Sequence, residues 1–152
     1  MTSEPRCFLD TNIFVYAHDR SEPEKQRRAR GILLDLSRLK VGAISTQVLL
    51  EFYNVVTRRL PARLTAQEAY EQTQIAAVSW PVLPVTQAVA LEAVRGARDH
   101  GLSILDAQIW ATARLNQLSL VFSEDLAGAT IEGVRFVDPL AEEFALGDYL
   151  AP

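Results

Sequence analysis

Several features that would assign a function are missing from this sequence. Its 152 residues include one cysteine, Cys7, so no disulfide can form within the chain, and the apolar neighbours Phe8 and Leu9 predict a core position for this thiol. No apolar run approaches the ~18 residues of a membrane span, and residues 1–5 lack the basic and apolar regions of a secretion signal. We therefore expect a cytoplasmic protein.

Two common kinds of site are also missing. The two histidines, His18 and His100, do not form a zinc-ligand spacing with each other or with the single cysteine. The sequence has no glycine-rich loop that could cradle a phosphate group. With 49% apolar and 22% charged residues, the composition is that of an ordinary globular protein, and we expect a single domain over residues 1–152.

Charge is unevenly distributed along the chain, whose net charge is −4. Residues 1–63 contain 11 lysines and arginines against 7 acids, whereas residues 64–152 contain 4 against 12. An arginine-rich surface beside an acidic centre suits a metal-dependent nuclease, because arginines bind phosphates while carboxylates bind metal. Charged helix faces exposed to solvent explain most such clusters, so the uneven charge gives only secondary support.

Short apolar segments alternate with segments of helical periodicity. Strands are predicted at residues 6–9, 41–45, 118–122 and 134–137, and helices at 11–18, 22–39, 46–60, 65–78, 86–100 and 105–116. Ser21 and Thr65 are each followed three residues later by a glutamate, the pattern of a helix-capping box. The alternation predicts an α/β sandwich with a short parallel sheet flanked by helices.

Two acids follow predicted strands. Asp10 comes directly after Leu9, and Asp125 lies just past Phe122. Open α/β sheets bind ligands at the carboxyl ends of their strands. We therefore expect these two carboxylates to lie at one ligand-binding edge of the sheet.

Two further acids lie on apolar helix faces. Glu51 shares a face with Val48, and Asp106 shares one with Ile109. Burying an ionised carboxylate is costly unless a cation or hydrogen bonds compensate, and neither face shows a lysine or arginine. A shared metal ion would compensate both acids. An all-carboxylate set favours magnesium or manganese over zinc, and such an ion can activate water for attack on a phosphodiester.

Each acid also has a purely structural explanation. Asp10 suits the N-cap of the helix that follows it, and Asp106 suits the acidic arm of a capping box. Glu51 could form a buried ion pair with a distant arginine, while Asp125, beside Glu124, suits a solvent-exposed turn. Only their joint placement indicates a metal site, and the number of ions stays open.

Four segments resemble the motifs of the PIN-domain ribonucleases and, within them, the VapC-type toxins of bacterial toxin-antitoxin pairs. They are Phe8-Leu9-Asp10-Thr11-Asn12, Val48-Leu49-Leu50-Glu51-Phe52, Leu105-Asp106-Ala107 with Ile109-Trp110-Ala111, and Phe122-Ser123-Glu124-Asp125-Leu126. The resemblance spans nearly the whole chain. It implies a PIN-like α/β/α sandwich, Mg²⁺- or Mn²⁺-dependent cleavage of RNA, a homodimer, and inhibition by a small cognate antitoxin protein.

The resemblance also implies roles for individual residues. The catalytic and metal-binding quartet would be Asp10, Glu51, Asp106 and Asp125. Asn12 would orient Asp10 or a metal-bound water, and Ser123 would supply a hydroxyl near the fourth acid. Asn12 also suits a helix start, and Ser123 a turn. Glu124 is next to Asp125, and we prefer Asp125 because it lies two residues after Ser123.

Other functions stay open at this stage. A PIN nuclease that processes RNA without an antitoxin would share the same site. A phosphotransferase with Asp10 as nucleophile is disfavoured, because such enzymes commonly have a second aspartate where this chain has Asn12. A catalytically inactive binding module would not need four acids. The arginines that would contact RNA are also undecided among Arg27, Arg28, Arg30, Arg58, Arg59 and Arg63.

Overall fold

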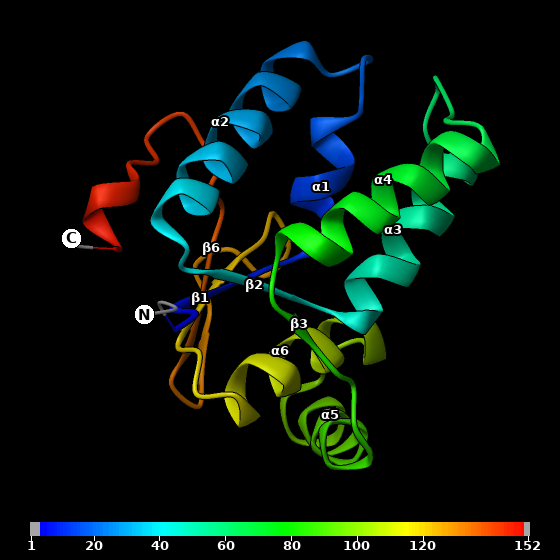
Figure 1. The fold of residues 1–152 in the computed structure, drawn as a ribbon. Coiled ribbons are helices and arrows are strands. Elements are labelled where there is room, and N and C mark those ends of the chain that lie inside the picture. Colours follow the sequence, from blue (N-terminus) through cyan, green and yellow to red (C-terminus); the bar gives the residue numbers. More distant parts are fainter. Residues whose placement is uncertain (1–3, 151–152) are drawn as a thin grey trace.

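The computed structural model, which describes residues 4–150, has a sheet of six strands in the order β3-β2-β1-β4-β6-β5 at its centre (Figure 1). The strands are β1 (Cys7–Leu9), β2 (Gly42–Ser45), β3 (Val82–Leu83), β4 (Leu120–Phe122), β5 (Thr130–Ile131) and β6 (Val134–Val137). All neighbouring pairs are parallel except β5 with β6. Strands β1, β2 and β4 are entirely buried, as expected for central strands covered on both faces.

Six α-helices of the described chain flank this sheet. They are α1 (Thr11–Ala17), α2 (Pro23–Leu39), α3 (Thr46–Arg58), α4 (Ala66–Ser79), α5 (Gln87–His100) and α6 (Ile104–Leu115). In Figure 1, α1 and α2 lie on one side of the strands, and α5 and α6 lie on the other. The predicted α/β/α sandwich is confirmed. None of the helices within residues 4–150 is long and apolar enough to cross a membrane.

One of the two predicted capping boxes is wrong. Thr65 caps α4 as expected, because its hydroxyl accepts the Glu68 N–H while the Glu68 carboxylate accepts the Thr65 N–H. Glu22, however, is the N-cap of α2 and makes no capping hydrogen bond with its side chain. The Ser21 hydroxyl instead donates a hydrogen bond to Asp19. It therefore stabilises a local turn and not the first turn of α2.

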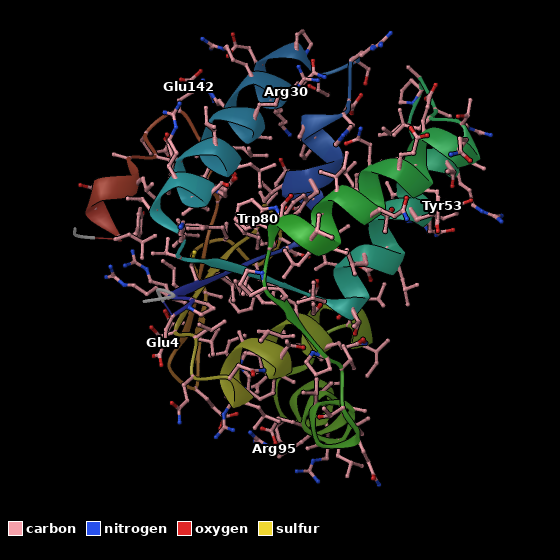
Figure 2. The ribbon with its side chains drawn as sticks, viewed as in Figure 1. Glu4, Arg30, Tyr53, Trp80, Arg95 and Glu142 are labelled. Carbon is pink, nitrogen blue, oxygen red and sulfur yellow. The ribbon has the colours of Figure 1, made fainter. Side chains whose placement is uncertain are left out.

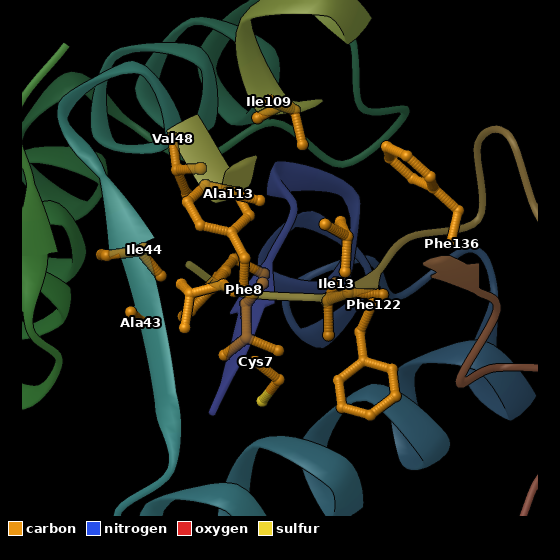
Figure 3. Packing of buried hydrophobic residues seen from close by; sticks show 14 of the residues in the cluster. Cys7, Phe8, Ile13, Ala43, Ile44, Val48, Ile109, Ala113, Phe122 and Phe136 are labelled. Carbon is orange, nitrogen blue, oxygen red and sulfur yellow. The ribbon is translucent and has the colours of Figure 1, made fainter. Parts of the chain in front are cut away.

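The hydrophobic core surrounds β1. Phe8 packs among side chains that include Ile44 of β2 and Ile13 of α1 (Figure 3). Cys7 is fully buried, as predicted, and burial raises the pKa of its thiol to about 12. Trp80, labelled in Figure 2, lies just after α4. Its ring packs edge-to-face on Phe14 at 5.8 Å between ring centroids, which connects the end of α4 to α1.

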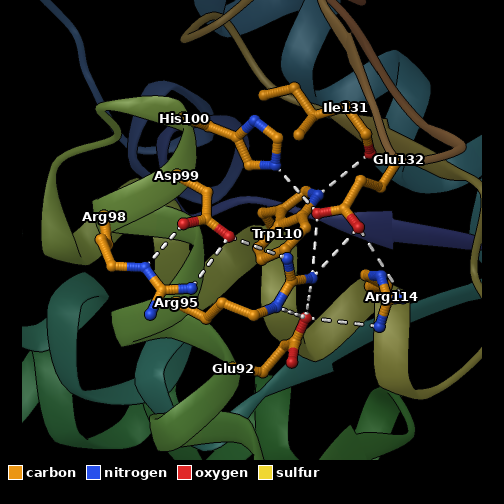
Figure 4. A network of polar contacts seen from close by, with 9 residues as sticks. All are labelled: Glu92, Arg95, Arg98, Asp99, His100, Trp110, Arg114, Ile131 and Glu132. Atoms are coloured by element: carbon orange, nitrogen blue, oxygen red, sulfur yellow. Dashed lines mark hydrogen bonds and ion pairs between the residues drawn. The ribbon is translucent and has the colours of Figure 1, made fainter.

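A polar network connects α5 and α6 with the β5–β6 hairpin (Figure 4). The Glu132 carboxylate, in the hairpin turn, accepts hydrogen bonds from Arg95 and from His100, the latter at 2.8 Å. The Trp110 indole N–H donates to the Ile131 carbonyl at 3.0 Å. These bonds fix α6, the helix that contains Asp106, against the far edge of the sheet.

Candidate metal centre

All four predicted acids line one cavity of about 500 Å³ beside the carboxyl ends of the central strands. Each comes from a different part of the fold. Asp10 directly follows β1, Glu51 lies in α3, Asp106 lies in the first turn of α6, and Asp125 lies in the loop after β4. The topology therefore brings together acids that are up to 115 residues apart in the sequence.

Asp10 is the most buried of the four, with 6% of its surface exposed. It is the N-cap of α1, and its carboxylate accepts hydrogen bonds from the Thr11 N–H at 2.6 Å and the Ser123 hydroxyl at 2.7 Å. Burial raises the pKa of Asp10 to about 6; these hydrogen bonds oppose the rise, while the Asp125 and Glu51 carboxylates add to it. Asp10 therefore caps α1 and also lines the cavity.

Glu51 is half-buried rather than fully buried, so the expectation of a desolvated acid is too strong. Its two carboxylate oxygens accept hydrogen bonds from the Thr11 hydroxyl at 2.9 Å and the Gln47 amide at 3.1 Å. Thr11 therefore contacts both Asp10 and Glu51, through its backbone and its side chain. Within residues 4–150, no lysine or arginine forms an ion pair with Glu51, and the alternative of a buried ion pair is not realised.

Asp106 is also half-buried. Its backbone N–H donates to the Ser103 hydroxyl at 3.2 Å, so the serine caps α6 as the pattern suggested. The capping box is incomplete, because the Asp106 carboxylate makes no hydrogen bond or ion pair with any other described residue. This carboxylate is therefore free to bind a cation in the cavity.

Asp125 is exposed and is held by a short chain of polar contacts. Ser123, fully buried, donates to Asp10 and accepts the Asp125 N–H at 2.9 Å. The Asn12 amide donates to Asp125 and to Ser123, each at 3.3 Å. Asn12 thus lies against the fourth acid and makes no hydrogen bond to Asp10. Burial and the nearby Asp106 carboxylate raise the pKa of Asp125.

Glu124 does not line this cavity, although its partner Tyr16 does. Its carboxylate accepts hydrogen bonds from the Tyr16 hydroxyl at 2.9 Å and from the Lys25 ammonium at 2.7 Å. Asp125 lines the cavity and Glu124 does not. This arrangement supports the preference for Asp125 as the fourth acid.

A hard divalent cation fits these residues by their chemistry. The cavity offers oxygen donors with no histidine or cysteine among its lining residues, which suits Mg²⁺ or Mn²⁺. Within residues 4–150, no three aspartate, glutamate, histidine or cysteine side chains lie close enough together to form a ready-made metal site. Mg²⁺ does not need one, because it keeps several waters and binds through one or two carboxylates.

The sequence did not reveal every residue of the cavity. Arg59, the C-cap of α3, lies about two turns beyond Glu51 and lines the cavity, which corrects the expectation that this helix face lacks a cation. Arg59 forms no ion pair with any acid among the described residues. Gln47 precedes Glu51 by one helical turn, and that i, i+4 spacing was the signal that could have identified it as a partner.

Comparisons with known proteins agree with this fold. A family model described as the PIN domain matches residues 7–129. A toxin-antitoxin complex from Klebsiella pneumoniae is 24% identical with a TM-score of 0.62, covering 88% of this chain and 97% of that chain. FitAcB from Neisseria gonorrhoeae is 22% identical with a TM-score of 0.65, covering 88% of this chain and 97% of that chain.

The VapC20 toxin of Mycobacterium tuberculosis, which cleaves the sarcin-ricin loop, is 21% identical with a TM-score of 0.60, covering 85% of this chain and 98% of that chain. At these identities, the solved structures establish the fold alone. No curated protein matches the sequence of the chain.

Proposed function

The chain belongs to the PIN domain family, and on that premise we propose that it is a metal-dependent endoribonuclease and the toxin of a toxin-antitoxin pair. The observation that carries this proposal is that Asp10, Glu51, Asp106 and Asp125 line one cavity together, and that none of these four forms an ion pair with a described lysine or arginine. One PIN domain would account for residues 1–152. The protein would act in the cytoplasm as a homodimer and would be inhibited by a small cognate antitoxin.

The side chains of the cavity have separable tasks in this proposal. A bound Mg²⁺ or Mn²⁺ supplies a Lewis acid and an acidified water. The metal ion would be held by Asp10, Glu51, Asp106 and Asp125, either directly or through its bound waters. Thr11 orients the first two carboxylates, because its N–H contacts Asp10 and its hydroxyl contacts Glu51. Ser123 connects Asp10 to the loop of Asp125.

The cavity gives no support to a phosphotransferase that uses Asp10 as its nucleophile. Both carboxylate oxygens of Asp10 already accept hydrogen bonds, and the side chain is almost fully buried. Two residues further on, Asn12 contacts Asp125 and cannot serve as a second acid. We retain the ribonuclease as the proposed function.

Removal of divalent metal tests the proposal most directly. The purified protein should cleave RNA with Mg²⁺ or Mn²⁺ present and should lose cleavage in excess EDTA, because the carboxylates alone cannot acidify water. Adding back Mn²⁺ should restore the rate, as followed with an RNA oligonucleotide that fluoresces when cut. Undiminished cleavage in EDTA would exclude a metal-dependent site.

Arg59 is the arginine that we expect to contact the RNA backbone. It alone among the six candidate arginines lines the cavity. Arg27 is paired with Glu24 at 2.7 Å, and Arg28 and Arg30 donate to backbone carbonyls, each at 2.8 Å. A guanidinium at the cavity wall is placed to bind a phosphate next to the bond that is cut.

Replacing Arg59 by alanine should therefore lower kcat/KM for RNA about 10- to 100-fold, the effect of losing one charge-assisted hydrogen bond. Arg58→Ala is the matched control, because this neighbouring arginine is exposed and does not line the cavity. Initial rates over a range of RNA concentrations measure both. Equal losses in the two variants would show that only overall charge matters.

A further inference from the structure

The loop after β4 contains two adjacent carboxylates that point in different directions. Asp125 lines the cavity, whereas Glu124 binds Tyr16 of α1 and Lys25 of α2. The Lys25 ammonium also lies 3.3 Å from the Tyr16 hydroxyl and 4.7 Å from the centroid of its ring. We call Tyr16, Lys25 and Glu124 the outer clamp.

One face of α1 makes hydrogen bonds to both acids of this loop. Asn12 and Tyr16 are four residues apart, so they project from the same face of the helix. Asn12 contacts Asp125 and accepts the Glu124 N–H at 3.4 Å, while Tyr16 donates to the Glu124 carboxylate. The same helix thus fixes the backbone of the loop and the direction of each acid.

Electrostatics explain why the direction of Glu124 matters. Five acids already line the cavity, the four predicted ones and Asp19, and the charge of Glu124 is one cause of the raised pKa of Asp125. Without the Lys25 ammonium beside it, Glu124 would be a further negative charge able to turn toward the same space. Lys25 is the one lysine or arginine among the described residues that pairs with Glu124.

We propose that Lys25 and Tyr16 are positioning residues that hold the Glu124 carboxylate against α1 and α2. Of the two adjacent acids in the loop, only Asp125 then presents its carboxylate to the cavity. The role assigned to Asp125 rests on the proposed function, whereas the hold on Glu124 rests on the contacts of the outer clamp. The two parts can be tested separately.

Hydrogen exchange of the metal-free protein tests the outer clamp itself. Lys25→Met should speed exchange of the amides in residues 123–126 about fivefold, because the loop loses a charge-assisted hydrogen bond that opposes its opening. Tyr16→Phe should act in the same direction. Arg27→Met is the matched control: it removes a positive charge from α2 that is paired with Glu24 and does not touch the loop. Unchanged exchange with Lys25→Met would overturn the proposal.

Mn²⁺ titration by calorimetry tests the consequence for the cavity. Lys25→Met should raise the Kd for Mn²⁺ about tenfold, as is typical when an outer partner of a metal ligand is lost. Glu124→Gln should change it little, because a neutral amide can still bond Tyr16 and Lys25. The double variant should bind like Glu124→Gln, since the competing carboxylate is gone.

Three results would contradict this account. Tighter Mn²⁺ binding by Lys25→Met would show that Lys25 only repels the cation, and a double variant as weak as Lys25→Met would show that Glu124 does not compete. A Kd that stays at the wild-type value in Lys25→Met would also refute the positioning of Asp125. If the wild type binds no Mn²⁺, the proposed function fails, while hydrogen exchange still decides whether the outer clamp holds the loop.

Discussion

Replacing Asp106 by asparagine should reduce metal-dependent RNA cleavage about a thousandfold, which corresponds to several kcal/mol of lost transition-state stabilisation. The change keeps the size of the side chain and removes its charge. Because the Asp106 carboxylate makes no hydrogen bond or ion pair within residues 4–150, and its capping contact with Ser103 uses the backbone, the fold should lose little.

A fluorogenic RNA oligonucleotide measures this loss, and a thermal melt followed by circular dichroism verifies the fold. Asp35→Asn is the control, since this aspartate is exposed on α2 and lies outside the cavity. It should cleave like the wild type. Normal cleavage by a folded Asp106→Asn protein would refute the assignment of the cavity as the metal site.

If the protein is the proposed toxin, its expression in a bacterial host should stop growth, and co-expression of a small antitoxin encoded by an upstream gene should restore it. A partner has apolar surface available. In α4 the one buried residue is Ala69, while Tyr70, Ile75 and Val78 are at least half exposed. Exposed apolar side chains gathered on one element are typical of an interaction surface.

Growth curves with and without the upstream gene measure this effect. Expression of Asp106→Asn should leave growth normal, which separates toxicity through cleavage from toxicity through overproduction. If the wild-type protein cleaves RNA in vitro but does not slow growth, the RNA-processing nuclease without an antitoxin becomes the better explanation. Growth arrest by Asp106→Asn would exclude cleavage as the cause.

The strands that the sequence predicted are those of three or four mostly apolar or small residues. β1, β2, β4 and β6 lie within the predicted segments. β3 and β5 have two residues each, too few for any periodicity, and β3 lies between Pro81 and Pro84. Such short strands form by pairing with a neighbouring strand. The residues of the strand itself do not record that pairing.

The sequence predicted four of the acids that line the cavity, but not most of the side chains that hold them. Strand ends and apolar helix faces located Asp10 and Glu51, because these positions follow from local pattern and general topology. The position two residues after Ser123 favoured Asp125 over Glu124, but the ion pair that holds Glu124 comes from Lys25, 99 residues away. No local pattern records a contact across that distance.

The central place of β1 has a consequence for the making of the protein. β1 pairs with β2, which follows closely, and with β4, which begins more than 110 residues later. A chain that is still being translated cannot pair β1 with β4 until β4 has been made, and pairing of such distant segments is slow. We therefore expect the cavity that Asp10 and Asp125 share to form late in folding, after β1 has paired with β2.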